Sequence, residues 1–366
     1  MDRRLGPALR MLFTLAWGAA LAVLSGCVAL PERLAAELRA PAAAEASAFG
    51  PVDQGTIGSP DQAAMSPALN AAQPKVWRAF SVDQLPLASG QVIVSEAGGA
   101  MSLLYSLVAA EYAPWIHAGI VSVEDGAVVV YEANADLSPL PGLVPTDALR
   151  GGVRRIGIEK FARGKRIIGL YALPPEADAV RLVAFAQEQH RRRTPFDPFF
   201  DSDDSSALYC TELVALALAE AGVARVEPTP MQRNASLASG LDWLHIRSPA
   251  VYLAGHIVAP LREVARWSPE LSPAQIDAYF AAKRELHRRF DDRARLGQLF
   301  DWTGLSLRYR PGVQRFVDAA LAEVPEALRG GTEAALRIEH LARQHFEGAP
   351  LHEGDVQRVS ALPPDR

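Results

Sequence analysis

An Asp-Gly pair between two apolar runs is the feature that most constrains how this chain can fold. Residues 115–123 and 127–133 are rich in apolar and β-branched side chains, and Asp125 and Gly126 stand between the two runs. Asp-Gly in this position is typical of a two-residue β-hairpin turn. The sequence therefore predicts two neighbouring antiparallel strands.

The length of this turn decides which side chains of the two strands face each other. If Asp125 and Gly126 are the only loop residues, positions 124 and 127 pair, and His117 lies opposite Asn134. Side chains alternate between the faces of a strand, so Glu132 shares the face of Asn134 and is the diagonal neighbour of His117. A two-residue turn thus predicts a contact between His117 and Glu132, whereas a three-residue turn would move Glu132 to the far face.

The remaining elements predict an α+β fold, because strands and helices do not alternate regularly. Further strands are expected at residues 91–94 and 250–258, and a second strand pair at 166–172 and its neighbours. Helices are expected at 100–111, 178–192 and from 210 to Gly222. Beyond Pro260 the pattern becomes helical, with candidates at 276–296, 313–328 and 332–346. We expect a catalytic domain at 76–260 and a helical C-terminal extension at 261–366.

The N-terminus has the pattern of a lipoprotein signal peptide. Arginines precede an apolar run at residues 11–24, which is short for a membrane span, and Leu24-Ser25-Gly26-Cys27 follows and resembles a bacterial lipobox. We expect residues 1–27 to be the signal, Cys27 to carry the lipid, and 28–75 to be a flexible Ala/Pro-rich tether. An uncleaved signal anchor is the alternative. This predicts a lipid-anchored protein of the cell envelope, with the outer membrane favoured because Val28 is not aspartate.

Cys210 is the one cysteine left after Cys27, and it lies at the start of an apolar-periodic helix. Unpaired backbone N–H groups and the positive end of the helix dipole favour a thiolate there. A small buried core residue is the alternative explanation. A nucleophilic cysteine also needs a base and a group that orients the base. His117 is the best candidate for the base and Glu132 for the orienting group, although a satisfied core histidine and an exposed strand-end carboxylate are the alternatives.

These residues carry a resemblance to a known family. Trp115-Ile-His117-Ala-Gly-Ile, then Tyr131-Glu-Ala, and an acidic loop closing in Tyr209-Cys-Thr-Glu-Leu-Val together resemble the YiiX/YebB branch of the permuted papain-like NlpC/P60 superfamily. The resemblance covers roughly residues 89–258. It implies a circularly permuted papain-like fold with a small antiparallel sheet packed on the cysteine helix. It also implies Cys210 as nucleophile, His117 as base and later acid, and Glu132 as orienting group.

Three further residues are candidates for substrate binding. Trp115 and Tyr209 flank the predicted catalytic positions, although an aromatic at the position of Tyr209 is at least as often a core residue. Asp197 can bind an amine or cap the turn before Pro198, and the cap is the favoured interpretation.

The predicted chemistry is acyl transfer through a thioester. An amide or peptide bond, with cell-wall peptide as its source, is the first hypothesis for the substrate. A membrane-tethered lipid-acyl hydrolase or acyltransferase like lecithin retinol acyltransferase is the second, and a non-catalytic binding lipoprotein is the third. A pocket lined by long aliphatic side chains would favour lipid, and charged groups would favour peptide.

Other chemistries and partners are not expected. The net charge is −5, which gives no reason to expect a nucleic-acid partner. His340 and His345 lack the spacing and the glutamate of a zinc helix, and neither a Gly-x-Ser-x-Gly elbow nor a Walker loop occurs. We therefore expect no metal and no cofactor. The expected partners are the membrane, through the anchor, and a peptide or lipid-like substrate.

Overall fold

The computed structural model describes residues 75–78, 82–136, 150–243, 246–303, 306–323 and 331–346. The predicted signal peptide, the predicted lipidation site Cys27 and the predicted tether up to residue 74 lie outside these residues. Among the described helices, none is long and apolar enough to cross a membrane.

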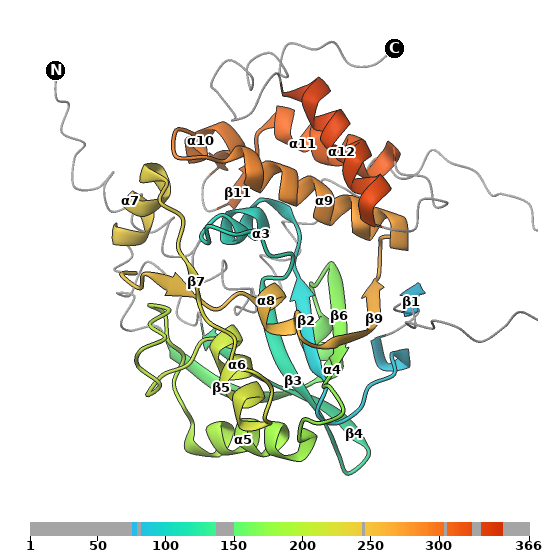
Figure 1. Ribbon diagram of the computed structural model, residues 1–366, viewed down its shortest axis with the longest axis vertical. Helices are drawn as coiled ribbons and strands as arrows, with labels where there is room; N and C mark the ends of the chain where they lie inside the picture. Colours follow the sequence, from blue (N-terminus) through green and yellow to red (C-terminus); the bar gives the residue numbers. More distant parts are fainter. Residues whose placement is uncertain are drawn as a thin grey trace, which may run out of the picture.

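A seven-stranded mixed sheet forms the centre of the molecule, in the order β1-β9-β6-β2-β3-β4-β5 (Figure 1). All neighbouring strands are antiparallel except β1 and β9, which pair in parallel at one edge. The strands are β1 (Lys75–Arg78), β2 (Val92–Glu96), β3 (His117–Glu124), β4 (Ala127–Asp136), β5 (Arg150–Gly157), β6 (Ile167–Ala172) and β9 (Arg262–Ser268). The fold is therefore α+β, as predicted, but its sheet is larger than expected because β1, β5 and β9 were not anticipated.

The predicted hairpin is confirmed. Glu124 pairs with Ala127 and Ile120 with Tyr131, which is the register of a two-residue turn. Asp125 and Gly126 have φ values of 51° and 81°. Positive φ at both turn residues matches the right-handed twist of the two strands and suits the Asp-Gly sequence.

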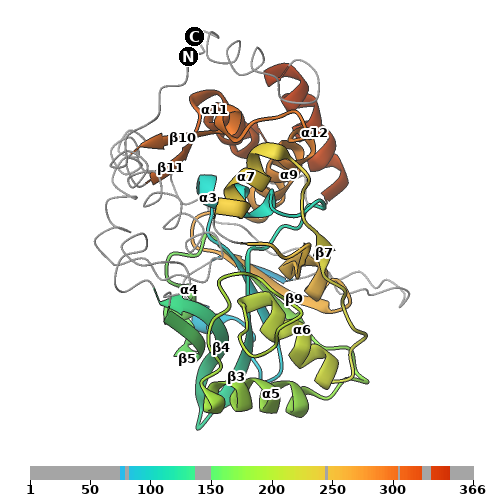
Figure 2. The same cartoon turned by 90° about the vertical axis from the view of Figure 1, so that its left-hand side faces the viewer.

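Helices cover both faces of the sheet (Figure 2). On one face, α5 (Ala179–Arg192) and α6 (Cys210–Glu220) pack against β3 and β4, and Asp178 caps α5 by accepting hydrogen bonds from two backbone N–H groups. On the other face lie α4 (Ile158–Ala162) and the 3-10 helix η2 (Val82–Gln84). Alternate residues of the central strands are consequently buried in two separate cores, with Ile120 in the larger and Val121 in the smaller.

The C-terminal helices pack beyond one end of the sheet (Figure 1). They are α9 (Pro273–Arg289), α11 (Pro311–Glu323) and α12 (Gly331–His345), with α10 (Leu296–Leu299) and the hairpin of β10 (Phe300–Thr303) and β11 (Ser306–Tyr309) between α9 and α11. Their apolar residues join the larger core of the sheet. The predicted boundary at residue 260 precedes β9, so both predicted segments contribute strands to the central sheet.

Several elements differ from their predicted form. The expected strand at 250–258 is a two-residue strand, β8 (Ala250–Val251), paired with β7 (Thr229–Pro230) and followed by the helix α8 (Ala254–Val258). A short apolar run does not distinguish a buried strand from a buried helix, which explains this error. The helix expected at 100–111 ends earlier, as α3 (Gly99–Ser106), and α7 (Ala235–Trp243) was not predicted.

Candidate active site

Cys210 is the first residue of α6, as its sequence context predicts. Tyr209 before it is extended, with φ −96° and ψ 170°, and its carbonyl accepts the first helical hydrogen bond from Leu213 at 3.0 Å. The N–H groups of a first helical turn have no intrahelical acceptor. The thiol of Cys210 is fully buried and lies at this helix start, in the position that stabilises a thiolate.

His117 of the hairpin interacts with both Glu132 of the hairpin and Cys210 of α6. Its Nε2 lies 2.5 Å from Oε2 of Glu132, and the ring of Phe161 from α4 stacks on the imidazole with centroids 5.6 Å apart. The imidazole also interacts with the side chain of Cys210, through charge and a hydrogen bond. The contact predicted between His117 and Glu132 is therefore confirmed. Cys210, His117 and Glu132 form a series of three buried side chains, with His117 in the middle.

The electrostatics of the series favour a charged imidazolium. Burial lowers the pKa of His117, but the negative charges of Cys210 and Glu132 outweigh it, so the pKa is raised above its usual value. For Glu132, burial raises the pKa, while His117, Arg154 and Lys165 together lower it to about 2. Glu132 therefore stays a carboxylate at neutral pH and fixes the orientation of the ring.

Arg154 is a site residue that the sequence patterns did not reveal. It pairs with Glu132 across β4 and β5, and its Nε and a terminal nitrogen lie 2.8 and 2.6 Å from Oε1. Its side chain is one third exposed, whereas Glu132 is buried. An arginine opposite a buried carboxylate is the signal that would have revealed it, but strand β5 itself was not predicted.

The candidates for substrate binding have mainly structural contacts. Trp115 is buried and packs edge-to-face on Tyr171 and Phe280. Asp197 accepts hydrogen bonds from the backbone N–H groups of Phe199 and Asp201, as the capping interpretation predicts. A role of either residue in substrate binding stays a prediction.

Tyr209 connects the nucleophile segment to its surroundings. Its hydroxyl accepts a hydrogen bond from the backbone N–H of Tyr252 at 3.0 Å. Its ring packs edge-to-face on Phe200, with ring centroids 5.1 Å apart. Thr211 on the far side of Cys210 donates to the carbonyl of the same Tyr252 at 2.8 Å. The residues before and after Cys210 are therefore both tied to Tyr252.

Glu212 is a second titratable group that the sequence patterns did not single out. It lies two residues after Cys210 and is buried. Burial raises its pKa to about 8; the backbone N–H of Tyr209 opposes this, and three nearby aspartates add to it. A carboxyl that is mostly neutral at pH 7 brings little negative charge to the start of the helix, where the thiolate would form.

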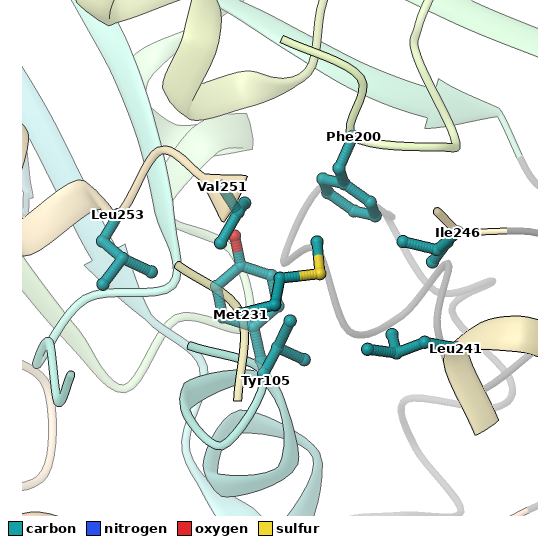
Figure 3. Close-up of a pocket in the computed structure, with 8 residues that line it drawn as sticks. Tyr105, Phe200, Met231, Leu241, Ile246, Val251 and Leu253 are labelled. Atoms are coloured by element: carbon teal, nitrogen blue, oxygen red, sulfur yellow. The ribbon is translucent and has the colours of Figure 1, made fainter. Parts of the chain in front are cut away.

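An apolar pocket lies beside Phe200, whose ring packs on Tyr209 (Figure 3). Its cavity volume is about 10 Å³, and no charged side chain lines it. Its walls include Tyr105, Phe200, Met231, Leu241, Ile246 and Leu253. These residues come from segments that are widely separated in the sequence, so the pocket was not predictable from local patterns.

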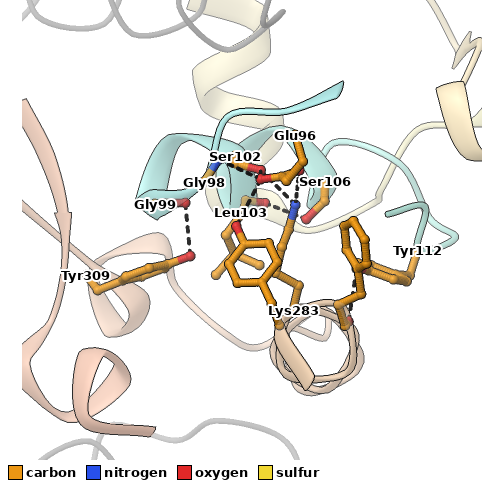
Figure 4. A network of polar contacts seen from close by, with 11 residues as sticks. Glu96, Gly98, Gly99, Ser102, Leu103, Ser106, Tyr112, Lys283 and Tyr309 are labelled. Atoms are coloured by element: carbon orange, nitrogen blue, oxygen red, sulfur yellow. Dashed lines mark hydrogen bonds and ion pairs between the residues drawn. The ribbon is translucent and has the colours of Figure 1, made fainter. Parts of the chain in front are cut away.

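A buried polar cluster lies at the end of β2, the strand that pairs with the His117 strand β3 (Figure 4). Ser95 of β2 pairs with His117, and the following residue, Glu96, is fully buried. Lys283 of α9 donates to Glu96 at 2.9 Å and to Ser102 at 2.7 Å. Glu96 also accepts hydrogen bonds from Tyr279, Ser102 and the backbone of Gly98, so its charge is fully compensated.

Comparisons with known proteins give a distant likeness. No protein-family model matches the chain, and no curated protein matches it. A crystal structure described as metalloprotein yiiX from Escherichia coli O157:H7, DUF1105, aligns with 49% of this chain and 97% of its own, at 16% identity and a TM-score of 0.36. Likeness at this level assigns no activity. In the part of the chain that the structure describes, no group of three or more His, Cys, Asp and Glu residues is placed to hold a metal ion.

Proposed function

We propose that the chain is a thiol hydrolase that cleaves an amide or peptide bond through a thioester on Cys210. The observation that carries this proposal is the buried series Cys210–His117–Glu132, in which Nε2 of His117 lies 2.5 Å from Glu132 and the ring also bonds the thiol. A nucleophile, a base and an orienting group in this order are the arrangement that cysteine hydrolases need.

The steps follow from the roles of the three side chains. His117 takes the proton of the Cys210 thiol, and the thiolate attacks the substrate carbonyl carbon to give a tetrahedral oxyanion. Backbone N–H groups at the start of α6 are the candidate donors to that oxyanion. His117 then gives its proton to the leaving amine, and the thioester forms. Water activated by His117 hydrolyses the thioester, which releases the acid and restores the thiol.

The electrostatics support catalysis over a purely structural role. A buried ring paired with a carboxylate is compatible with a core histidine. However, that role gives no reason for the ring to bond the only described cysteine, at a helix start, with its pKa raised by the thiolate charge. Reactive cysteines are distinguished by this kind of electropositive environment.

The location and substrate complete the proposal. A lipid on Cys27 would anchor the chain in the cell envelope, with the outer membrane favoured and the folded part facing the periplasm, close to cell-wall peptide. The lipid-acyl alternative is favoured by one observation, the uncharged lining of the pocket beside Phe200. A non-catalytic binding lipoprotein is the remaining alternative, and trapping of an acyl-enzyme distinguishes it from both.

The test is to trap the acyl-enzyme. The full chain with Cys27→Ser is incubated with activated esters and p-nitroanilides, and adducts are located by mass spectrometry after rapid acid quenching. We expect an acyl adduct on Cys210 and turnover that Cys210→Ala abolishes. His117→Ala should reduce turnover at least about 100-fold. The matched control is His256→Ala, which removes a histidine bonded to Thr229 and not to Cys210. Equal turnover in Cys210→Ala would exclude the mechanism.

A further inference from the structure

We propose that Arg154 is a positioning residue that acts through Glu132, because it holds the buried carboxylate with one oxygen facing His117 and keeps it charged throughout the reaction. The inference rests on the proposed function and adds a fourth side chain to the series Cys210–His117–Glu132. It is carried by the way the two oxygens of Glu132 are divided between their partners.

Each carboxylate oxygen of Glu132 has its own partner. Nε and a terminal nitrogen of Arg154 lie 2.8 and 2.6 Å from Oε1, whereas Nε2 of His117 lies 2.5 Å from Oε2. A carboxylate that is bonded at both oxygens cannot rotate without breaking one of these contacts. Because the N–H donors of a guanidinium lie in one rigid plane, Arg154 fixes the direction from which Oε2 meets the imidazole.

The sheet places Arg154 for this contact. Glu132 and Arg154 are directly opposite each other in the register of β4 and β5, so their side chains share one face of the sheet. The side chain of Glu132 is 2% exposed and that of Arg154 is 32% exposed. The guanidinium therefore pairs with a buried carboxylate while part of it stays in water, which lowers the cost of burying the ion pair.

Arg154 is also a partner whose charge does not change during the proposed reaction. His117 becomes neutral when it gives its proton to the leaving amine, and burial then favours the protonated form of Glu132. A guanidinium stays charged, so Arg154 keeps Glu132 a carboxylate in that state too. The carboxylate in turn holds the neutral ring in the tautomer that donates from Nε2. Lys165 adds a second positive charge that acts on both Glu132 and His117.

The first experiment is a double-mutant cycle on turnover, with the full chain carrying Cys27→Ser and the ester or anilide that it cleaves fastest. Arg154→Met should lower kcat by up to about 100-fold and leave KM unchanged, because Arg154 acts through Glu132 and not on the substrate. Arg154→Lys keeps the charge without the two-nitrogen contact and should recover part of the loss. In the Glu132→Gln background, Arg154→Met should cause no further loss. An equal loss in both backgrounds would overturn the inference.

The matched control is Arg155→Met. Arg155 is the next residue of β5 and also pairs with a glutamate, since its Nε lies 2.7 Å from Oε2 of Glu124. Successive side chains of a strand point to opposite faces, so Arg155 is directed away from the face that Glu132 and Arg154 share. We expect Arg155→Met to leave kcat unchanged. A kcat in Arg154→Met as high as in this control would overturn the inference.

A second experiment tests the same role without catalysis, by the midpoint pH of acid unfolding followed by circular dichroism. The pKa of Glu132 is lowered in the folded chain, so its charged form contributes stability that is lost as the pH falls. Without Arg154 the carboxyl takes up its proton at higher pH. The midpoint should therefore rise in Arg154→Met, stay near the parent value in Arg154→Lys, and not rise when Arg154→Met is added to Glu132→Gln. An equal rise in that background would overturn the inference.

The two experiments separate this inference from the proposed hydrolase. The expected midpoints without any Cys210-dependent turnover would refute the hydrolase and retain Arg154 as the group that holds Glu132. Cys210-dependent turnover that Arg154→Met does not change would retain the hydrolase and overturn the role of Arg154.

Discussion

Replacing Glu132 with glutamine removes the charge that touches His117 while keeping a side chain of the same size. The two groups are buried, and the carboxylate oxygen lies 2.5 Å from Nε2. An opposite charge at this range typically shifts a pKa by about 1–3 units. We therefore expect the pKa of His117 to fall in Glu132→Gln. Arg154, left without its counter-ion, pushes the pKa in the same direction.

The assay is an NMR titration of the imidazole resonances, assigned by comparison with the His117→Ala variant. The Cys210 thiolate is followed in parallel by its far-ultraviolet absorbance, with Cys210→Ala as the blank, because this readout does not require access to a buried sulfur. Loss of the imidazolium should also make the thiolate less stable, so it should form at higher pH than in the unmodified site. Catalytic turnover near neutral pH should fall accordingly.

The matched control is Glu124→Gln. Glu124 is a carboxylate of the same strand as His117, but it bonds Tyr131, Arg155 and Gln187 and has no bond to the imidazole. We expect this variant to leave both titrations unchanged. A pKa of His117 that is the same or higher in Glu132→Gln would refute the stabilisation of the imidazolium by the Glu132 carboxylate. Circular dichroism of both variants confirms that the fold is retained.

Three further predictions concern stability. Lys283→Met leaves the buried Glu96 without its cation and should lower the free energy of unfolding by about 3–5 kcal/mol. The double variant Lys283→Met, Glu96→Gln should recover most of this loss. An undiminished loss in the double variant would contradict the reasoning. In Gly152→Ala the new Cβ would lie 2.4 Å from the carbonyl oxygen of Thr194 and should cost about 1–3 kcal/mol by urea unfolding, whereas Gly157→Ala meets only an ordinary contact at 3.5 Å and should be far milder. Because the pKa of Glu132 in the folded chain is lowered to about 2 from an ordinary 4.5, its contribution is present above pH 4.5 and is lost as the pH falls toward 2. The stability difference between the parent and Glu132→Gln should therefore shrink by on the order of 3 kcal/mol over that window, and a constant difference would contradict the low pKa.

The elements that the sequence predicted are those with local causes. Asp125 and Gly126 adopt the positive φ values of a two-residue turn, and this alone sets the register that brings Glu132 to His117. Asp178 caps its helix through its own side chain, and Cys210 begins the next helix. In each case a few neighbouring residues supply both the signal and the contact.

Sequence alone therefore determined the hairpin, the register that follows from a two-residue turn, and the position of the thiol at a helix start. Only the tertiary structure decided what surrounds them. Arg154 reaches Glu132 from a strand that its own residues did not reveal, and Lys283 compensates Glu96 across 187 positions of the chain. The apolar pocket likewise draws its walls from distant segments. These features arise from packing between elements, whose free energy depends on which surfaces meet and not on the pattern within any one segment.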